Sequence, residues 1–207
     1  IGVPLGILCA IFLAFFGSNR VAKIAKAGVQ LLAGIPSVVY GFFGLVVLVP
    51  FIRENFGGTG QSILCASLVL GIMILPTIIT LSESALKAVP EAYYEGALAL
   101  GADHERSVMR VMLPAAISGV LASIILAIGR AIGETMAVIM IAGNQVQMPD
   151  AITDGIRTMT ANIVLEMGYA ADLHRGALIG TACVLFVFIL IINFAFSALK
   201  KKGRNNG

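Results

Sequence analysis

The chain has 207 residues, of which 58% are hydrophobic and only 12% are charged, and its formal net charge is +3. A soluble domain carries about twice this share of charged residues, so the composition excludes an ordinary water-soluble globule and points to a protein surrounded by lipid. Cys9, Cys65 and Cys183 lie in apolar stretches without a Cys-x-x-Cys pair, which argues against a disulfide framework or a zinc site.

Five apolar stretches follow one another along the chain, and each is long enough, or nearly so, to cross a bilayer as a helix. Lipid requires every backbone polar group to be bonded within its own segment, so we expect helices. The candidate spans are Ile1–Phe16, Ile35–Phe51, Ser62–Leu81, Ala115–Ala142 and Ala177–Leu199. We predict an all-α, multi-span transmembrane bundle that forms a single membrane domain over residues 1–207. Because the chain begins inside an apolar run without a Met, we also expect an amino-terminal part to precede it.

The basic residues fix the expected orientation, since Lys and Arg concentrate in cytoplasmic loops. With five alternating spans, one side receives Arg20, Lys23, Lys26, Lys87, Arg106, Arg110, Lys200, Lys201, Lys202 and Arg204. The other side receives only Arg53, Arg157 and Arg175. We therefore expect the carboxyl terminus in the cytoplasm. The basic stretch Gly17–Gly34 is mildly amphipathic, and we expect it to lie along the membrane surface.

The cytoplasmic segment Ser82–Pro114 is too polar to span and is patterned like two short helices joined by an elbow. Pro90 favours a helix start, and Gly101 favours a left-handed helix end. Asp103 can cap a second helix that ends at Leu113, with Pro114 opening the fourth span. Apolar residues on this elbow either dock into a partner protein or pack beneath the protein's own spans, and the residues alone leave both interpretations open.

The fourth candidate span contains two charged residues, Arg130 and Glu134, which are four apart and are expected to share a helix face. Charged groups within a span cost about 2.5–3.5 kcal/mol each and usually mark a transport path. The Arg130 guanidinium suits an oxyanion, and Glu134 could accept a hydrogen bond from a protonated phosphate. The alternative is a self-neutralising pair that only fixes helix packing. Gly129 and Gly133 form an adjoining small face for a close helix contact.

One stretch of the elbow resembles a known family. Glu95-Gly96-Ala97, three residues, Gly101, nine residues and Val111-Met112-Leu113-Pro114 are similar to the EAA loop of binding-protein-dependent ABC importer permeases. The family's usual Ala and Ile are replaced here by Gly96 and Val111. The resemblance implies a type I ABC importer permease fold. It also implies that Glu95, Ala97 and Gly101 belong to a coupling helix that docks on an ATPase subunit.

Two further motifs resemble the phosphate-importer permeases, and more the PstC-type subunit than the PstA-type one. They are Gly34-Ile35-Pro36-Ser37-Val38-Val39-Tyr40-Gly41 and Gly129-Arg130-Ala131-Ile132-Gly133-Glu134-Thr135-Met136-Ala137-Val138, with Met159-Thr160-Ala161-Asn162-Ile163 downstream. The resemblance implies that Arg130 and Glu134 line the substrate pathway of an inner-membrane phosphate permease. It implies a PstA-type permease, two ATPase subunits, an extracytoplasmic phosphate-binding protein and membrane lipid as partners, and no nucleic acid.

The chain lacks a Gly-x-x-x-x-Gly-Lys-Ser/Thr phosphate loop, so we expect no cofactor in this chain, no enzymatic activity of its own, and ATP-Mg on the partner ATPase. His104 and His174 lie on opposite sides, and no metal site is expected. The external segment Gly143–Gly176 either contacts the binding protein or is a solvated loop with a short helix. The rival functions are a permease for sulfate, molybdate or phosphonate, a secondary transporter, and a non-transporting membrane scaffold.

Overall fold

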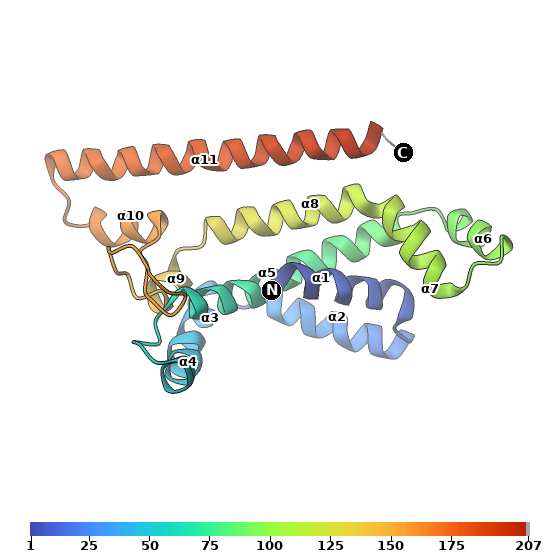
Figure 1. Cartoon of the computed structure of the whole chain (residues 1–207), viewed down its shortest axis with the longest axis horizontal. Helices are drawn as coiled ribbons and strands as arrows, with labels where there is room; N and C mark the ends of the chain where they lie inside the picture. Colours follow the sequence, from blue (N-terminus) through green and yellow to red (C-terminus); the bar gives the residue numbers. More distant parts are fainter. Residues whose placement is uncertain (206–207) are drawn as a thin grey trace. The chain divides into compact units, whose positions relative to one another are not determined.

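The computed structural model describes the backbone of residues 1–205 and the side chains of residues 1–195. In this part every regular element is helical, apart from one isolated β-bridge between Gly143 and Ile156. The all-α prediction is therefore confirmed (Figure 1). The helices are α1 (Gly2–Ile11), α2 (Asn19–Gly34), α3 (Ser37–Phe43), α4 (Val49–Phe56), α5 (Ile63–Lys87), α6 (Glu91–Ala99), α7 (His104–Ser107), α8 (Leu113–Ile132), α9 (Met136–Ile141), α10 (Met159–Met167) and α11 (Asp172–Asn205).

In the described part of the chain, four continuous helical segments are long and apolar enough to cross a membrane. They are Ser37–Phe56, Ile63–Lys87, His104–Ile132 and Asp172–Ala195, and a fifth apolar helix, Gly2–Phe16, is shorter. Each predicted span therefore has a helical counterpart. The side chains of Lys200, Lys201, Lys202 and Arg204 lie outside the described residues, and the cytoplasmic carboxyl terminus stays a prediction.

Several predicted boundaries are wrong. The third span continues past Leu81 to Lys87, so the elbow begins later than Ser82. The prediction of one continuous span over 115–142 fails at both ends, because the helix runs without interruption from His104 and stops at Ile132. Pro114 therefore lies inside a helix instead of opening one.

A π-helical turn explains how the helix continues through Pro114. Proline has no N–H and its ring collides with the carbonyl four residues earlier in a regular α-helix. Val108–Met112 form a π turn, in which the N–H of Leu113 donates to the Val108 carbonyl. The wider turn changes the path of the carbonyls that the ring would otherwise meet. The same solution recurs at Pro50, which follows the π turn Gly44–Leu48 by the same two-residue spacing.

The chain divides into two compact units. The first comprises Ile1–Gly34, Ile74–Ile128 and the residues from Phe194 onward, and the second comprises Ile35–Met73 and Gly129–Asn193. Both α5 and α8 contribute residues to each unit, so the division does not test the prediction of a single membrane domain, which stays a prediction.

The first unit is held together by close packing between α5 and α8. A Cβ atom placed on Gly119 would come within 2.4 Å of the Ala85 Cβ, so glycine is what lets the two helices approach. Nearby, the hydroxyls of Ser82 and Ser123 are fully buried and lie 2.7 Å apart in a hydrogen bond. The apolar core of this unit contains Ala10, Ile11, Leu86, Val108, Ala116 and Val120.

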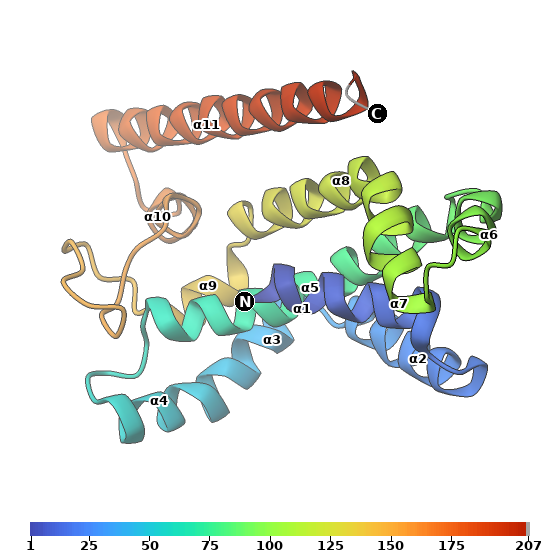
Figure 2. The same ribbon diagram turned by 45° about the vertical axis from the view of Figure 1, so that its right-hand side comes forward.

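Helix α2 belongs to the first unit, and its predicted position along the membrane surface stays a prediction. It runs back beside α1 in both views (Figures 1 and 2). None of its residues is fully buried. The Lys26 Nζ atom nevertheless lies 2.6 Å from Glu83 Oε1, and the Lys87 Nζ atom lies 2.7 Å from the same oxygen. Glu83 is only 7% exposed, and its two lysines supply the compensation that a buried carboxylate needs.

The second unit is built on the contact between α3 and α9. A Cβ atom on Gly41 would come within 2.7 Å of the Ala137 Cα, so these backbones touch. The core around them contains Tyr40, Val49, Ile52, Cys65, Ala66, Val69, Met73, Val138, Ile141 and Ala142. Gly57, Gly58 and Gly60 all have positive φ, so the chain turns sharply in the glycine loop that precedes α5.

Candidate functional site

The charged motif of the fourth span lies at a break in the helix. Helix α8 ends at Ile132, and α9 begins only at Met136. Gly133 has a low helix propensity, and its N–H still donates to the Gly129 carbonyl at 3.2 Å. The Glu134 side chain then turns to the next helix, where its Oε1 accepts a hydrogen bond from the Ala137 N–H at 3.1 Å. This contact satisfies one of the open donors at the start of α9.

The expectation that Arg130 and Glu134 share a helix face is therefore wrong. Arg130 lies in the last turn of α8, whereas Glu134 lies beyond the helix end. Among the described side chains no ion pair joins the two residues. Arg130 is exposed and Glu134 is half-buried. A cation in the last turn is favoured by the helix dipole, so Arg130 does not depend on Glu134 for its position.

Helix α10 is attached to this break. The Thr160 hydroxyl donates to the main-chain carbonyl of Glu134 at 3.1 Å. Thr158 caps the start of α10 by accepting from the Ala161 N–H. The downstream motif Met159–Ile163 thus forms the first half of α10. Through Thr160 it binds the main-chain carbonyl of Glu134, a predicted pathway residue.

Arg157 was not proposed as a site residue, although it organises the neighbouring loop. Its guanidinium forms an ion pair with Glu166 at 2.8 Å and donates to the Asn162 side chain at 3.3 Å. Its Nε atom donates to the Asn144 carbonyl at 3.1 Å. The hydrogen bond from Tyr169 to Glu166 raises the pKa of the Tyr169 phenol. The segment Gly143–Gly176 is therefore an ordered loop followed by a helix, and its contact with a binding protein stays a prediction.

The two phosphate-permease motifs meet in space. Gly41, which ends the first motif, packs on Ala137 of the second, in the close contact described above. A larger residue at position 41 would displace the start of α9 and with it the break beside Arg130. The contact between Gly41 and Ala137 was not predicted, because neither motif contains a signal that identifies the segment on which it packs.

The elbow has the geometry that the sequence predicts at its centre. Gly101 has a φ of +84°, and the Ala102 N–H donates to the Ala97 carbonyl at 3.1 Å, which closes α6. Asp103 accepts from the Arg106 N–H at 2.7 Å and caps α7. Pro90 lies just before α6, not in its first turn.

The apolar residues of the elbow divide between two faces. Tyr93, Leu98 and Leu100 are exposed, and Leu100 is 91% exposed. Tyr94 turns inward, where its hydroxyl is 2.8 Å from His104 Nδ1. Ala97 is buried and lies with Tyr93 and Leu100 in a groove of about 420 Å³. Glu95 is exposed. The elbow thus has one side that packs on the protein itself and another side that is exposed to solvent. The first agrees with packing against the protein's own helices, and the second leaves a surface on which a partner protein could dock.

Within the described residues, no three His, Cys, Asp or Glu side chains come together as a metal site would require. The fold and these features define a class: a helical membrane protein with a helical elbow between two spans and a charged break in one span. The chain belongs to the family of binding-protein-dependent transport system inner membrane components, whose pattern matches residues 2–205.

Individual relatives agree with this membership. The chain is 40% identical to the probable ABC transporter permease protein YqgH of Bacillus subtilis, covering 97% of this chain and 67% of the relative. It is 32% identical to the phosphate transport system permease protein PstC of Haemophilus influenzae, covering 93% of this chain and 67% of that protein. The chain thus spans about two thirds of the length of these relatives.

Solved structures show the same fold. The MetNI methionine ABC transporter, in inward-facing conformations, matches with a TM-score of 0.72 at 22% identity, over 98% of this chain and 86% of that one. An ABC transporter that imports the acidic polysaccharide alginate matches with a TM-score of 0.68 at 16% identity, over 96% and 73%. The type I ABC importer permease fold predicted from the elbow is confirmed.

Proposed function

We propose that this chain is a permease subunit of an ATP-driven phosphate importer and forms half of its translocation pathway. The observation that carries the proposal is Arg130, an exposed guanidinium at the broken end of an otherwise apolar helix. An exposed guanidinium is unfavourable against lipid, so Arg130 is expected to face water or another subunit. Several relatives, including that of Haemophilus influenzae, are phosphate transport permeases.

Arg130 is proposed to receive the phosphate after it leaves its hydration shell. Its planar guanidinium can donate two parallel hydrogen bonds to two phosphate oxygens. Glu134 already accepts from the Ala137 N–H, but a carboxylate has about four acceptor positions. It can therefore also accept from the O–H of a protonated phosphate, which sulfate does not carry at neutral pH.

The exposed side of α6 supports docking to an ATPase subunit. Glu95, Gly101 and the groove at Ala97 are the proposed contact residues, and Leu100 is the most exposed apolar anchor. In this proposal ATP-Mg binds the ATPase pair, and closure of that pair moves α6 and the spans attached to it. The permease chain itself carries out no covalent chemistry.

The proposed assembly contains this chain, a PstA-type permease, two ATPase subunits and an extracytoplasmic phosphate-binding protein in the inner membrane. The carboxyl terminus lies in the cytoplasm. Sulfate, molybdate or phosphonate permeases remain the nearest rivals for substrate. A secondary transporter is less well supported, because a docking elbow has no role without an ATPase.

Uptake of radiolabelled phosphate by proteoliposomes that contain the whole complex tests the proposal. Arg130→Gln should lower uptake at least about 100-fold, since each charge-assisted hydrogen bond contributes about 1.5–3 kcal/mol and two are lost. Arg175→Gln, another exposed arginine at the start of α11, is the matched control and should transport normally. Undiminished uptake by Arg130→Gln in a fully assembled complex would refute the role of Arg130. Uptake of sulfate in place of phosphate by the unaltered complex would refute the substrate.

A further inference from the structure

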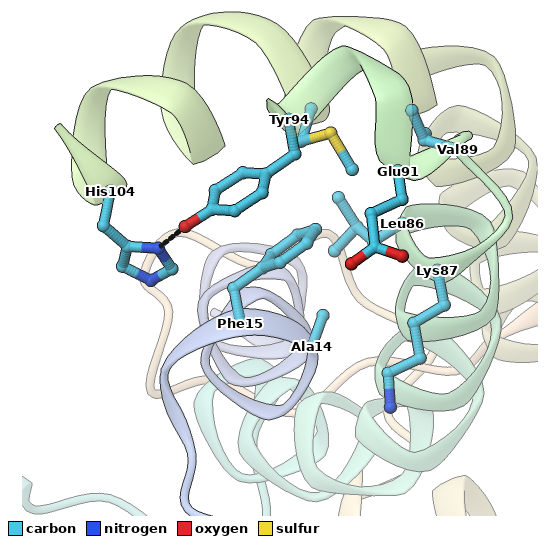
Figure 3. A pocket seen from close by; sticks show the side chains of 9 residues that line it. Ala14, Phe15, Leu86, Lys87, Val89, Glu91, Tyr94 and His104 are labelled. Atoms are coloured by element: carbon cyan, nitrogen blue, oxygen red, sulfur yellow. Dashed lines mark hydrogen bonds between the residues drawn. The ribbon is translucent and has the colours of Figure 1, made fainter. Parts of the chain in front are cut away.

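A cavity of about 380 Å³ lies in the first unit, between the elbow and the ends of the helices above it. Four elements contribute to it: the end of the first apolar helix, the end of α5, the start of α6 and α7 with the turn that follows. Its side chains are drawn in Figure 3. The volume is within the range of pockets that hold small ligands.

The cavity lies where two apolar helices end. Lys87 is the last residue of α5, and Phe15 belongs to the final turn of the apolar helix Gly2–Phe16. Lys, Tyr and other amphipathic residues concentrate at the level of lipid headgroups, where a helix leaves the hydrocarbon. A cavity bounded by these helix ends is therefore at the depth of the headgroups.

Two groups of opposite charge line the cavity. Lys87 keeps one ion pair with Glu83 at 2.7 Å, and its ammonium has three donors, so two remain for another acceptor. Glu91 is exposed at the first position of α6, and its carboxylate points into the cavity beside the Phe15 ring (Figure 3). The near-balance of charge disfavours a simple anion, because Glu91 would repel it.

Aromatic rings complete the wall next to Glu91. Phe15, Tyr94 and His104 all line the cavity, and the Tyr94 hydroxyl is held by His104 Nδ1 at 2.8 Å. Aromatic rings beside a carboxylate form a favourable surrounding for an organic cation. The cavity therefore offers a site for a cation at Glu91 and a site for an anion at Lys87.

We propose that this cavity binds the headgroup of a phospholipid with a primary ammonium, namely phosphatidylethanolamine. The lipid phosphate accepts hydrogen bonds from Lys87, and the ethanolamine ammonium donates to Glu91 and lies against the aromatic rings. The exposed apolar side chains of the helix Gly2–Phe16, among them Leu8 and Phe12, are available to the acyl chains. The choline headgroup lacks N–H groups, so it cannot donate hydrogen bonds to Glu91. The headgroup of phosphatidylglycerol has no cation that could pair with Glu91. The inference does not depend on which anion the importer carries.

Native mass spectrometry of the complete complex in detergent, titrated separately with the three phospholipids, tests this proposal. We expect phosphatidylethanolamine to bind at least about tenfold more tightly than phosphatidylcholine or phosphatidylglycerol of the same acyl chains. Glu91→Gln and Lys87→Gln should each remove this preference. Glu105→Gln, an exposed carboxylate that does not line the cavity, is the control and should keep it.

Neither substitution leaves Glu83 without a cationic partner, so a loss of lipid preference can be assigned to the cavity. Glu91→Gln leaves the Lys87–Glu83 ion pair in place, and Lys87→Gln leaves Glu83 paired with Lys26. Equal binding of the three lipids would overturn the proposal. So would an ethanolamine preference that survives both substitutions, since the headgroup would then bind elsewhere.

Discussion

Glycine at position 119 lets α5 and α8 approach, and its replacement by alanine should destabilise the chain by about 2 kcal/mol. The added Cβ would lie 2.4 Å from the Ala85 Cβ, whereas two carbon atoms in contact need about 3.5–4.0 Å. The helices must therefore separate by about 1 Å. Such overpacking costs about 1–3 kcal/mol.

Two further effects adjust this figure and nearly cancel. Separation of the helices also stretches the buried Ser82–Ser123 hydrogen bond of 2.7 Å, and bonds of this kind between membrane helices contribute about 0.6–1.7 kcal/mol. Alanine restores about 1 kcal/mol because it is a better helix former than glycine. The steric cost therefore remains as the net effect.

The assay is unfolding of the purified chain in mixed micelles by increasing dodecyl sulfate, followed by circular dichroism. Gly129→Ala in the same helix is the matched control, because a Cβ there meets nothing within 4 Å. The double variant Gly119→Ala, Ala85→Gly should recover most of the loss, since the colliding carbon is removed. The steric reasoning would be refuted if Gly119→Ala and Gly129→Ala unfolded at the same midpoint, or if the second substitution restored nothing.

Three other substitutions test the polar contacts. Glu83→Gln should lower the free energy of unfolding by about 1–3 kcal/mol in the same assay. The cost is smaller than for a fully buried ion pair because both lysines are partly exposed. A stability equal to that of the unaltered chain would contradict this prediction. Asp103→Ala removes the cap of α7 and should cost about 1 kcal/mol, seen as faster hydrogen exchange at residues 104–107, whereas Asp103→Asn should retain most of the protection. Arg157→Ala should speed cleavage of the loop before α10 by an added protease at least several-fold, and an unchanged cleavage rate would show that the loop is held by other contacts.

Features set by neighbours in the sequence were predictable. Gly101 adopts the left-handed conformation and Asp103 caps the next helix, because each effect involves only residues a few positions away. The spans were likewise found from apolar runs, since lipid imposes a length and a helical backbone on each of them. The effects of neighbouring residues and the demands of the lipid can therefore both be inferred from the sequence.

Contacts between distant segments were not predictable in the same way. Gly41 and Ala137 touch because two helices cross there, and neither residue type specifies the other. The end of α8 was also missed, since an apolar run continues through Gly133 and Glu134 into α9. Hydropathy measures the preference for lipid and is insensitive to one unwound turn whose carboxylate caps the following helix.

The break changes what the charged motif can do. In a continuous helix, Arg130 and Glu134 would neutralise each other, and the guanidinium would be occupied before any substrate arrived. With Glu134 turned toward α9, its Oε1 bonded to the Ala137 N–H, the guanidinium stays exposed at the end of α8. Helix ends in membrane proteins are where irregular backbone is tolerated because it lines a cavity or meets another subunit. The unwound turn thus keeps the Arg130 guanidinium free of Glu134, whereas an unbroken helix would let the two charges neutralise each other.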